Sequence, residues 1–229
     1  MMKIAFIDHY DSFSFNLIDW LRSGPDPLVV ERVCHDDRRG LDRVAAAELP
    51  LVLSPGPGHP DPSPAVQSLL GEALGHRPVL GVCLGHQILA RLAGLAVGRC
   101  RAPWHGAARR IRVVDPGGFM ARMPSTFRAA SYNSLTVADS RGASLVKVSA
   151  RCETDGEIQA LEYGTRGDPG QALGVQFHPE SFMSENQEAL LGNWKSQVFC
   201  YFSKGNRHGR FTPDADAGKS DCPVHSDPA

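Results

Sequence analysis

The first 93 residues alternate between short apolar runs and segments whose apolar residues recur at helical spacing. The apolar runs have the length of buried strands, and they predict strands at residues 3–7, 28–33, 51–53 and 78–82. The helical segments follow these runs, at residues 12–22, 41–49, 64–74 and 84–93. Ser12 is expected to be the N-cap of the first helix. Strands that alternate with helices indicate a parallel sheet with helices on both faces.

The pattern changes after residue 94, where the predicted strands are short and separated by turns. These strands are predicted at residues 95–97, 110–114, 136–137, 145–148 and 159–163. A further strand at 172–177 precedes a closing amphipathic helix at 186–202. The sequence therefore predicts an α/β fold: an open, mixed but largely parallel sheet with helices on both faces and an antiparallel extension.

Composition separates a folded body from a polar tail. Of the 229 residues, 42% are hydrophobic and 21% are charged, which is typical of a soluble globular protein. We expect one domain over residues 1–202. Residues 203–229 have almost no apolar anchors, which predicts a disordered tail. Cys222 and His225 are therefore interpreted as incidental rather than as ligands.

Charge and cysteine spacing exclude several classes of function. The 24 basic and 25 acidic residues nearly cancel, so neither a nucleic-acid footprint nor a membrane-binding basic patch is expected. No apolar run approaches the length of a membrane span, and the start lacks the features of a signal peptide. The six cysteines show no zinc-like spacing, so we expect free thiols in a cytoplasmic protein with no metal site.

Cys83 lies between the fourth predicted strand and the helix that follows it, in the segment GVCLGHQ at residues 81–87. A strand-to-helix elbow of this form exposes the side chain at its tip. The N-terminus of the helix directs free N–H groups toward the sulfur and favours the thiolate, which is the nucleophilic form. A buried core cysteine would need neither flanking glycine, so the elbow predicts a nucleophile.

Two other segments could serve such a nucleophile. The loop SPGPGHPDP at residues 54–62 directly follows the third predicted strand, at the edge where open α/β sheets bind ligands. A surface connector is an equally good interpretation of this loop alone. In the segment FHPES at 177–181, His178 and Glu180 are two residues apart in extended backbone, so both side chains project to one side. Glu180 could then orient His178 as the third member of a triad.

These motifs together resemble the class I, triad-type glutamine amidotransferases, specifically the small subunits of anthranilate synthase and aminodeoxychorismate synthase. The resemblance covers residues 3–202 and is carried by SPGPG at 54–58, GVCLGHQ at 81–87 and GVQFHPES at 174–181. A fourth motif, YDSF at residues 10–13, is similar to the branch that works with chorismate. The resemblance implies a flavodoxin-like core and a glutaminase.

The resemblance also implies roles for particular residues. Cys83 would attack the side-chain amide of L-glutamine, His178 would move the protons and Glu180 would orient His178. The N–H groups of Gly58 and Leu84 would form the oxyanion hole. The glutamine itself would be held by Gly56, Pro57, Gly58, Gln87, Ser134 and Leu135. Ammonia would pass to a chorismate-using synthase large subunit, and magnesium would belong to that partner, leaving no cofactor in this chain.

Two positions depart from the family pattern and leave the partner open. Asn133 stands where the family commonly has histidine, and Ala107 where it commonly has lysine. The leading hypothesis is a subunit of anthranilate synthase, and aminodeoxychorismate synthase or a related secondary-metabolism enzyme is the alternative. A stand-alone γ-glutamyl hydrolase would have no use for the YDSF segment. A catalytically silent regulatory subunit would not need the complete triad.

Overall fold

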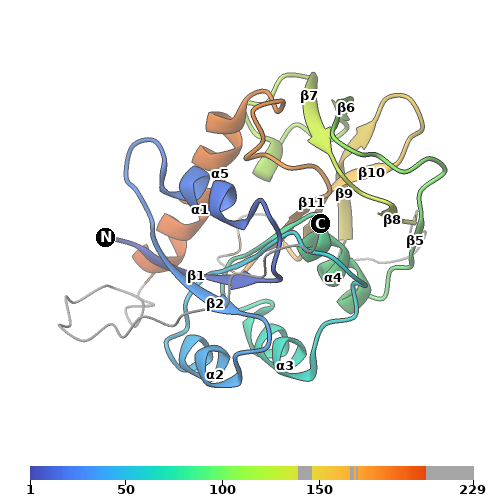
Figure 1. The fold of residues 1–229 in the computed structure, drawn as a ribbon. Coiled ribbons are helices and arrows are strands. Elements are labelled where there is room, and N and C mark those ends of the chain that lie inside the picture. The colour runs from blue at the N-terminus through green and yellow to red at the C-terminus, as the bar shows by residue number, and fades with distance from the viewer. Residues whose placement is uncertain (139–145, 166–167, 169, 205–229) are drawn as a thin grey trace.

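A nine-stranded mixed sheet forms the centre of the molecule (Figure 1). The computed structural model describes residues 1–138, 146–165, 168 and 170–204. Five strands are mutually parallel and follow the order β2 (Val29–Cys34), β1 (Lys3–Asp8), β3 (Leu51–Leu53), β4 (Val79–Val82) and β11 (Ala172–Val175). This order of the five strands is that of a flavodoxin-like core, and it brings the carboxyl ends of β1, β3, β4 and β11 to one edge.

Helices cover both faces of the parallel strands, as Figure 1 shows. One face carries α1 (Ser14–Arg22) and α5 (Gln187–Ser203), and the other carries α2 (Arg38–Ala46), α3 (Pro64–Ala73) and α4 (Leu84–Leu92). Residues of β1 alternate between the two layers: Ile4 and Phe6 pack with α1 and α5, whereas Ala5 and Ile7 pack with the other three helices. The predicted α/β architecture with helices on both faces is therefore confirmed.

The antiparallel extension is also confirmed, and it contains one strand that the sequence pattern missed. Beyond β11 the sheet continues through β10 (Ile158–Tyr163), β9 (Val146–Cys152), β6 (Ala107–Val113) and β7 (Thr126–Ser131). A separate two-stranded sheet pairs β5 (Val97–Arg99) with β8 (Leu135–Val137). The missed strand is β7, whose alanines and single exposed Arg128 give a weak strand signal.

One local expectation needs correction, and another falls largely outside the described residues. The first helix begins at Ser14, and Ser12 is exposed. The N-cap is Phe13, which makes no side-chain cap hydrogen bond, and Asp11 closes a turn just before the helix because its Oδ1 accepts the Phe13 N–H at 2.8 Å. The expected tail at 203–229 lies outside the described residues except for Ser203, which ends α5, and Lys204.

The cysteines differ from the prediction at one position. Cys83, Cys100, Cys152 and Cys200 are free thiols, but Cys34 at the end of β2 is disulfide-bonded. The prediction weighed only the redox compartment and contained no information on distances between cysteines. No helix among the described residues is both long and apolar enough to cross a membrane.

Glycine at position 85 is what allows α4 to lie directly on β3. A Cβ added to Gly85 would lie 2.4 Å from the carbonyl oxygen of Leu53, which is main chain and has no rotamer to change. Gly85→Ala should therefore cost about 2–3 kcal/mol of unfolding free energy, the usual penalty for overpacking. Gly71→Ala in α3 is the matched control, since nothing lies within 4 Å of its added Cβ, and it should gain about 0.5–1 kcal/mol. Urea denaturation of both variants measures the difference, and equal stabilities would contradict this close approach.

Candidate active site

The backbone of Cys83 is strained at the turn between β4 and α4. Its φ of 51° and ψ of −101° lie outside the regions that side-chain-bearing residues favour. The position is fixed from both sides: the Cys83 N–H donates to the Val175 carbonyl oxygen at 2.8 Å, and the Gln87 N–H donates to the Cys83 carbonyl oxygen at 3.1 Å. The side chain is 9% exposed. The predicted elbow is thus present, with the sulfur at the N-terminus of α4, but Cys83 is buried rather than exposed at the tip as the sequence motif predicted.

His178 and Glu180 lie together as their spacing predicted. The Nδ1 atom of His178 is 2.7 Å from Oε1 of Glu180, and the imidazole is buried. Because Glu180 occupies Nδ1, Nε2 is the ring nitrogen left for Cys83. Burial alone would lower the pKa of His178, but hydrogen bonding and charge from Cys83 and Glu180 raise that pKa well above its usual value. The three side chains have the order that a nucleophile, a base and an orienting carboxylate require.

The unpredicted strand β7 holds His178 in place. The His178 N–H donates to the Ala130 carbonyl oxygen at 2.9 Å, which forms an isolated antiparallel bridge. Ser184 closes the same segment, since its hydroxyl donates to the His178 carbonyl oxygen at 2.6 Å and accepts the Ala130 N–H at 3.0 Å. The segment that carries the base is thereby fixed to the edge of the sheet.

Aromatic rings from two distant segments pack against the imidazole. The ring of Tyr132, just after β7, is 4.9 Å from that of His178, and the ring of Phe13 is 5.7 Å away, both edge to face. Phe13 belongs to the YDSF motif at residues 10–13, so this motif contributes directly to the surroundings of the base. These rings limit the rotation of His178 while leaving its Glu180 contact intact.

The glycine-rich loop after β3 lies against the elbow. A Cβ on Gly56 would lie 3.0 Å from the Leu84 side chain, and the Gly85 N–H donates to the Ser54 carbonyl oxygen at 3.2 Å. Pro57 and Gly58 are exposed, and Gly58 has a φ of +98° that favours glycine. The N–H of Leu84 is at the first position of α4, where no acceptor exists within the helix. The structure therefore brings the predicted oxyanion groups to the same edge as Cys83.

Gln87 reaches the substrate segment expected at Ser134 and Leu135. Its Nε2 donates to the Leu135 carbonyl oxygen at 3.0 Å and to Oε1 of Gln176 at 3.1 Å. Ser134 is exposed, Leu135 begins β8, and the Ser134 carbonyl oxygen accepts the Cys100 N–H at 3.0 Å. Both protons of the Gln87 amide group are thus used within the protein, which leaves only its carbonyl oxygen for a ligand.

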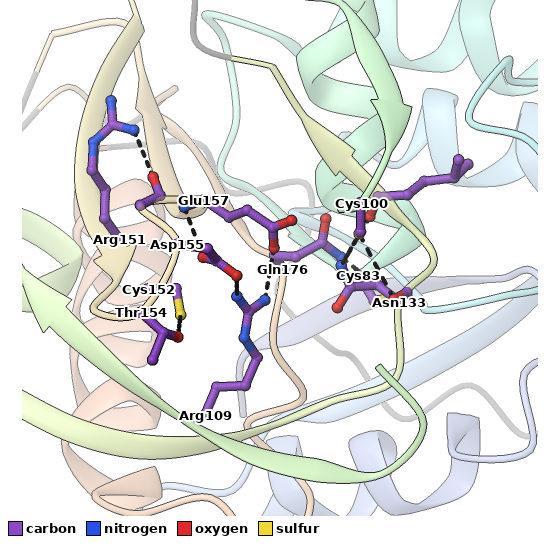
Figure 2. Close-up of polar contacts among 12 residues, drawn as sticks. Cys83, Cys100, Arg109, Asn133, Arg151, Cys152, Thr154, Asp155, Glu157 and Gln176 are labelled. Carbon is purple, nitrogen blue, oxygen red and sulfur yellow. Dashed lines mark hydrogen bonds and ion pairs between the residues drawn. The ribbon is translucent and has the colours of Figure 1, made fainter. Parts of the chain in front are cut away.

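Several site neighbours were missed because nothing in their local sequence marks them. Nε2 of Gln176 is 3.6 Å from the Cys83 sulfur. Asn133 donates to the Leu135 carbonyl oxygen at 2.9 Å and lies 3.3 Å from the Cys100 sulfur, so this departure from the family pattern supports the substrate segment. Figure 2 shows the contact between Asn133 and Cys100.

A buried ion cluster supports the loop that precedes β6. Arg109 pairs with Asp155 and with Glu157, the latter at 2.7 Å, as Figure 2 shows, and its guanidinium lies 4.3 Å from the Trp104 ring. The main-chain N–H of Trp104 in turn donates to the Asn133 carbonyl oxygen at 3.0 Å. The cluster therefore stabilises the segment that carries Asn133. The described residues contain no group of three or more His, Cys, Asp or Glu side chains arranged to hold a metal ion.

His9 is buried in its neutral form beneath the glycine-rich loop, so we expect acid to destabilise the fold. Burial and the nearby His35, only partly offset by Asp8, lower its pKa from 6.5 to about 4. The unfolded chain therefore binds more protons between these two values, and stability falls as the pH falls. When the pH is lowered from 7.5 to 5, the unfolding free energy of His9→Asn should fall by about 2 kcal/mol less than that of the unaltered protein. Urea denaturation at both pH values measures this, and parallel losses would show that His9 is not the group responsible.

The fold and this arrangement of Cys83, His178 and Glu180 define a cysteine amidohydrolase on a flavodoxin-like core. A family model described as glutamine amidotransferase class-I matches residues 5–197. The chain therefore belongs to the class I glutamine amidotransferases.

Three individual proteins illustrate what this chain is similar to. The chain is 39% identical over 206 residues to the pyocyanine-specific anthranilate synthase component 2 of Pseudomonas aeruginosa, covering 84% of this chain and 92% of the relative. It is 34% identical over 191 residues to aminodeoxychorismate synthase component 2 of Klebsiella aerogenes, covering 83% and 98%. Among solved structures, a candidate GMP synthase subunit from Thermoplasma acidophilum matches with a TM-score of 0.70 at 21% identity, covering 89% of this chain and 97% of that one. This last likeness concerns the fold alone.

Proposed function

We propose that this chain is the glutaminase subunit of a chorismate-aminating synthase, specifically of an anthranilate synthase. The observation that carries the proposal is the contact between His178 and Glu180 just after β11, the strand that pairs with β4 before the Cys83 elbow, in a chain of this family. Its relatives are small components of anthranilate and aminodeoxychorismate synthases.

The proposed reaction uses the three side chains in sequence. The Cys83 thiolate attacks the side-chain carbonyl carbon of L-glutamine, and the N–H groups of Gly58 and Leu84 stabilise the oxyanion. The imidazolium of His178 gives its proton to the departing nitrogen, so ammonia leaves and a γ-glutamyl thioester remains. His178 then removes a proton from water, which attacks the thioester and releases glutamate. This chain needs no cofactor for these steps, and magnesium belongs to the partner that uses chorismate.

An exposed aromatic residue beside the site supports a role for a partner protein. Phe182 is 92% exposed and follows Glu180 by two residues. Its segment is rigid, because Ser184 and Glu185 accept the N–H groups of Ala130 and Arg128 in β7. A fixed, exposed aromatic side chain is a typical interface anchor. A synthase that covers this face would also keep ammonia from escaping into water.

Reconstitution with each synthase large subunit distinguishes the two products. The chain is mixed with the large subunit of an anthranilate synthase or of an aminodeoxychorismate synthase, with chorismate, glutamine and magnesium. We expect glutamine-dependent formation of anthranilate, together with a rise in glutaminase activity when the anthranilate synthase component is added. Product formation only with the other large subunit would favour aminodeoxychorismate synthase, for which the 34% identical relative argues. Full glutaminase activity in the isolated chain, unchanged by either large subunit, would favour a stand-alone γ-glutamyl hydrolase.

A further inference from the structure

The amide of Gln176 lies against the nucleophile, in a position that the triad alone does not explain. Gln176 follows β11 and is fully buried, and its Nε2 is 3.6 Å from the Cys83 sulfur. This separation is within the range of a hydrogen bond to sulfur. The main chain holds the two residues in register, because β11 pairs with β4 from Ala172↔Val79 to Val175↔Val82. The Gln176 N–H also donates to the Gln159 carbonyl oxygen at 2.9 Å, which fixes its backbone from the other side.

The orientation of the Gln176 amide follows from its hydrogen-bond partners. The Leu135 carbonyl oxygen can only accept, so the Gln87 amide group must present Nε2 to it, at 3.0 Å. The second proton of the same Nε2 points to Gln176, at 3.1 Å, so Gln176 must present its oxygen there. The amide nitrogen of Gln176 is then left facing the sulfur. A flip of either amide would set two donors or two acceptors against each other in a buried site.

We propose that Gln176 is a positioning residue, which donates a hydrogen bond to the Cys83 sulfur and stabilises its thiolate form before glutamine is attacked. The inference rests on the proposed function, in which Cys83 is the nucleophile. A donor on one side of the sulfur favours the charged form over the neutral thiol, since a thiolate accepts hydrogen bonds more strongly. The donor also fixes the direction of the Cβ–Sγ bond relative to His178. The chain of contacts ends at Leu135, so the segment expected to hold glutamine also fixes the orientation of the donor.

Alkylation of Cys83 by iodoacetamide tests this role without glutamine or a partner protein. The rate at each cysteine is followed by peptide mass spectrometry from pH 5 to 10, with exposed Cys200 on α5 as the internal reference. Gln176→Met removes the donor at similar length. We expect its Cys83 to react about tenfold more slowly near neutral pH and the inflection of its rate profile to move up by about one pH unit, the effect of one hydrogen bond to a charged group. At high pH its rate should equal or exceed that of the unaltered protein, because a more basic thiolate is intrinsically more nucleophilic.

Two further variants separate this role from a structural one. Gln159→Met makes the same change at a neighbouring buried glutamine whose amide has no hydrogen-bond partner among the described residues, and it should leave the profile unchanged. Gln176→Glu keeps the oxygen that accepts from Gln87 but places a second oxygen toward the sulfur, so its Cys83 should react more slowly than in Gln176→Met at neutral pH. The Glu variant retains shape and volume, which guards against a Met variant that fails to fold.

The possible results of the alkylation experiment bear separately on the positioning role of Gln176 and on the proposed function. A profile for Gln176→Met that matches that of the unaltered protein and of Gln159→Met, or one that is lowered equally at all pH values, would overturn the positioning role and leave the proposed function standing. Cys83 that reacts no faster than Cys200 in the unaltered protein at neutral pH would overturn the activated nucleophile, and with it the proposed function. Alkylation rates for Gln176→Met that are lower than those of the unaltered protein near neutral pH, and equal or higher at high pH, would establish the inference.

Discussion

Cys83→Ala is expected to abolish glutamine-dependent amination by the reconstituted synthase while leaving amination from added ammonium unchanged. The sulfur is the group that attacks the amide in the proposed reaction, and Cys83 is the cysteine whose hydrogen bond and charge raise the pKa of His178. Loss of the nucleophile in a comparable triad costs on the order of 10⁶-fold in kcat. The ammonium-dependent rate depends only on the chemistry of the large subunit, so it shows that the large subunit is active, and gel filtration of the mixture measures whether the complex still forms.

Cys200→Ala is the matched control for this variant. It removes an exposed thiol from α5 and should leave both rates unchanged. Alanine at position 83 also relieves no strain, because the positive φ of 51° disfavours any residue with a Cβ. A Cys83→Ala complex that retained glutamine-dependent activity would show that another group attacks the amide. Loss of glutamine-dependent activity together with loss of the complex in gel filtration would point to a defect in assembly rather than in chemistry.

The sequence predicted the parallel half of the fold well because its strands are buried on both faces. Runs such as residues 4–7 and 51–53 are apolar throughout, and they lie in β1 and β3. The extension was harder to predict because its strands are only partly buried and rich in small or charged residues. The burial pattern of β7 is fixed by its neighbours, so the sequence Thr126–Ser131 gives little indication of a strand. Its contribution to the site, the bridge from Ala130 to His178, joins segments 48 residues apart.

The grouping of the candidate catalytic residues was predictable because each of them lies in a motif with its own local geometry. The flanking glycines of Cys83 mark an elbow, and the spacing of His178 and Glu180 places both side chains on one side. Gln176 carries no such mark, since a glutamine within a predicted strand is indistinguishable from a surface residue. Its contact with Cys83 depends on the pairing of β4 with β11, and its orientation depends on Gln87 in α4. Such chains of contacts between segments require the tertiary structure.

Glu180→Gln should reduce glutamine-dependent activity by on the order of 10³-fold, less than the loss in His178→Gln. The carboxylate accepts a hydrogen bond from Nδ1–H of His178 at 2.7 Å, which leaves Nε2 free to take a proton from Cys83. A glutamine amide could instead donate to Nδ1, which stabilises the tautomer with its proton on Nε2. The imidazole is then present in the tautomer that cannot take a proton at Nε2, whereas His178→Gln removes the imidazole altogether.

The pH dependence separates this role from simple structural support. Cys83 and Glu180 raise the pKa of His178, so removal of the negative charge from Glu180 lowers that pKa. The imidazolium that protonates the departing nitrogen would then be lost at a lower pH, and the alkaline limb of kcat/KM should move to lower pH. Glu185→Gln is the matched control, because its carbonyl oxygen can still accept the Arg128 N–H that Glu185 accepts at 2.8 Å. A Glu180→Gln loss equal to that of His178→Gln, with no shift of the alkaline limb, would contradict an orienting role for Glu180.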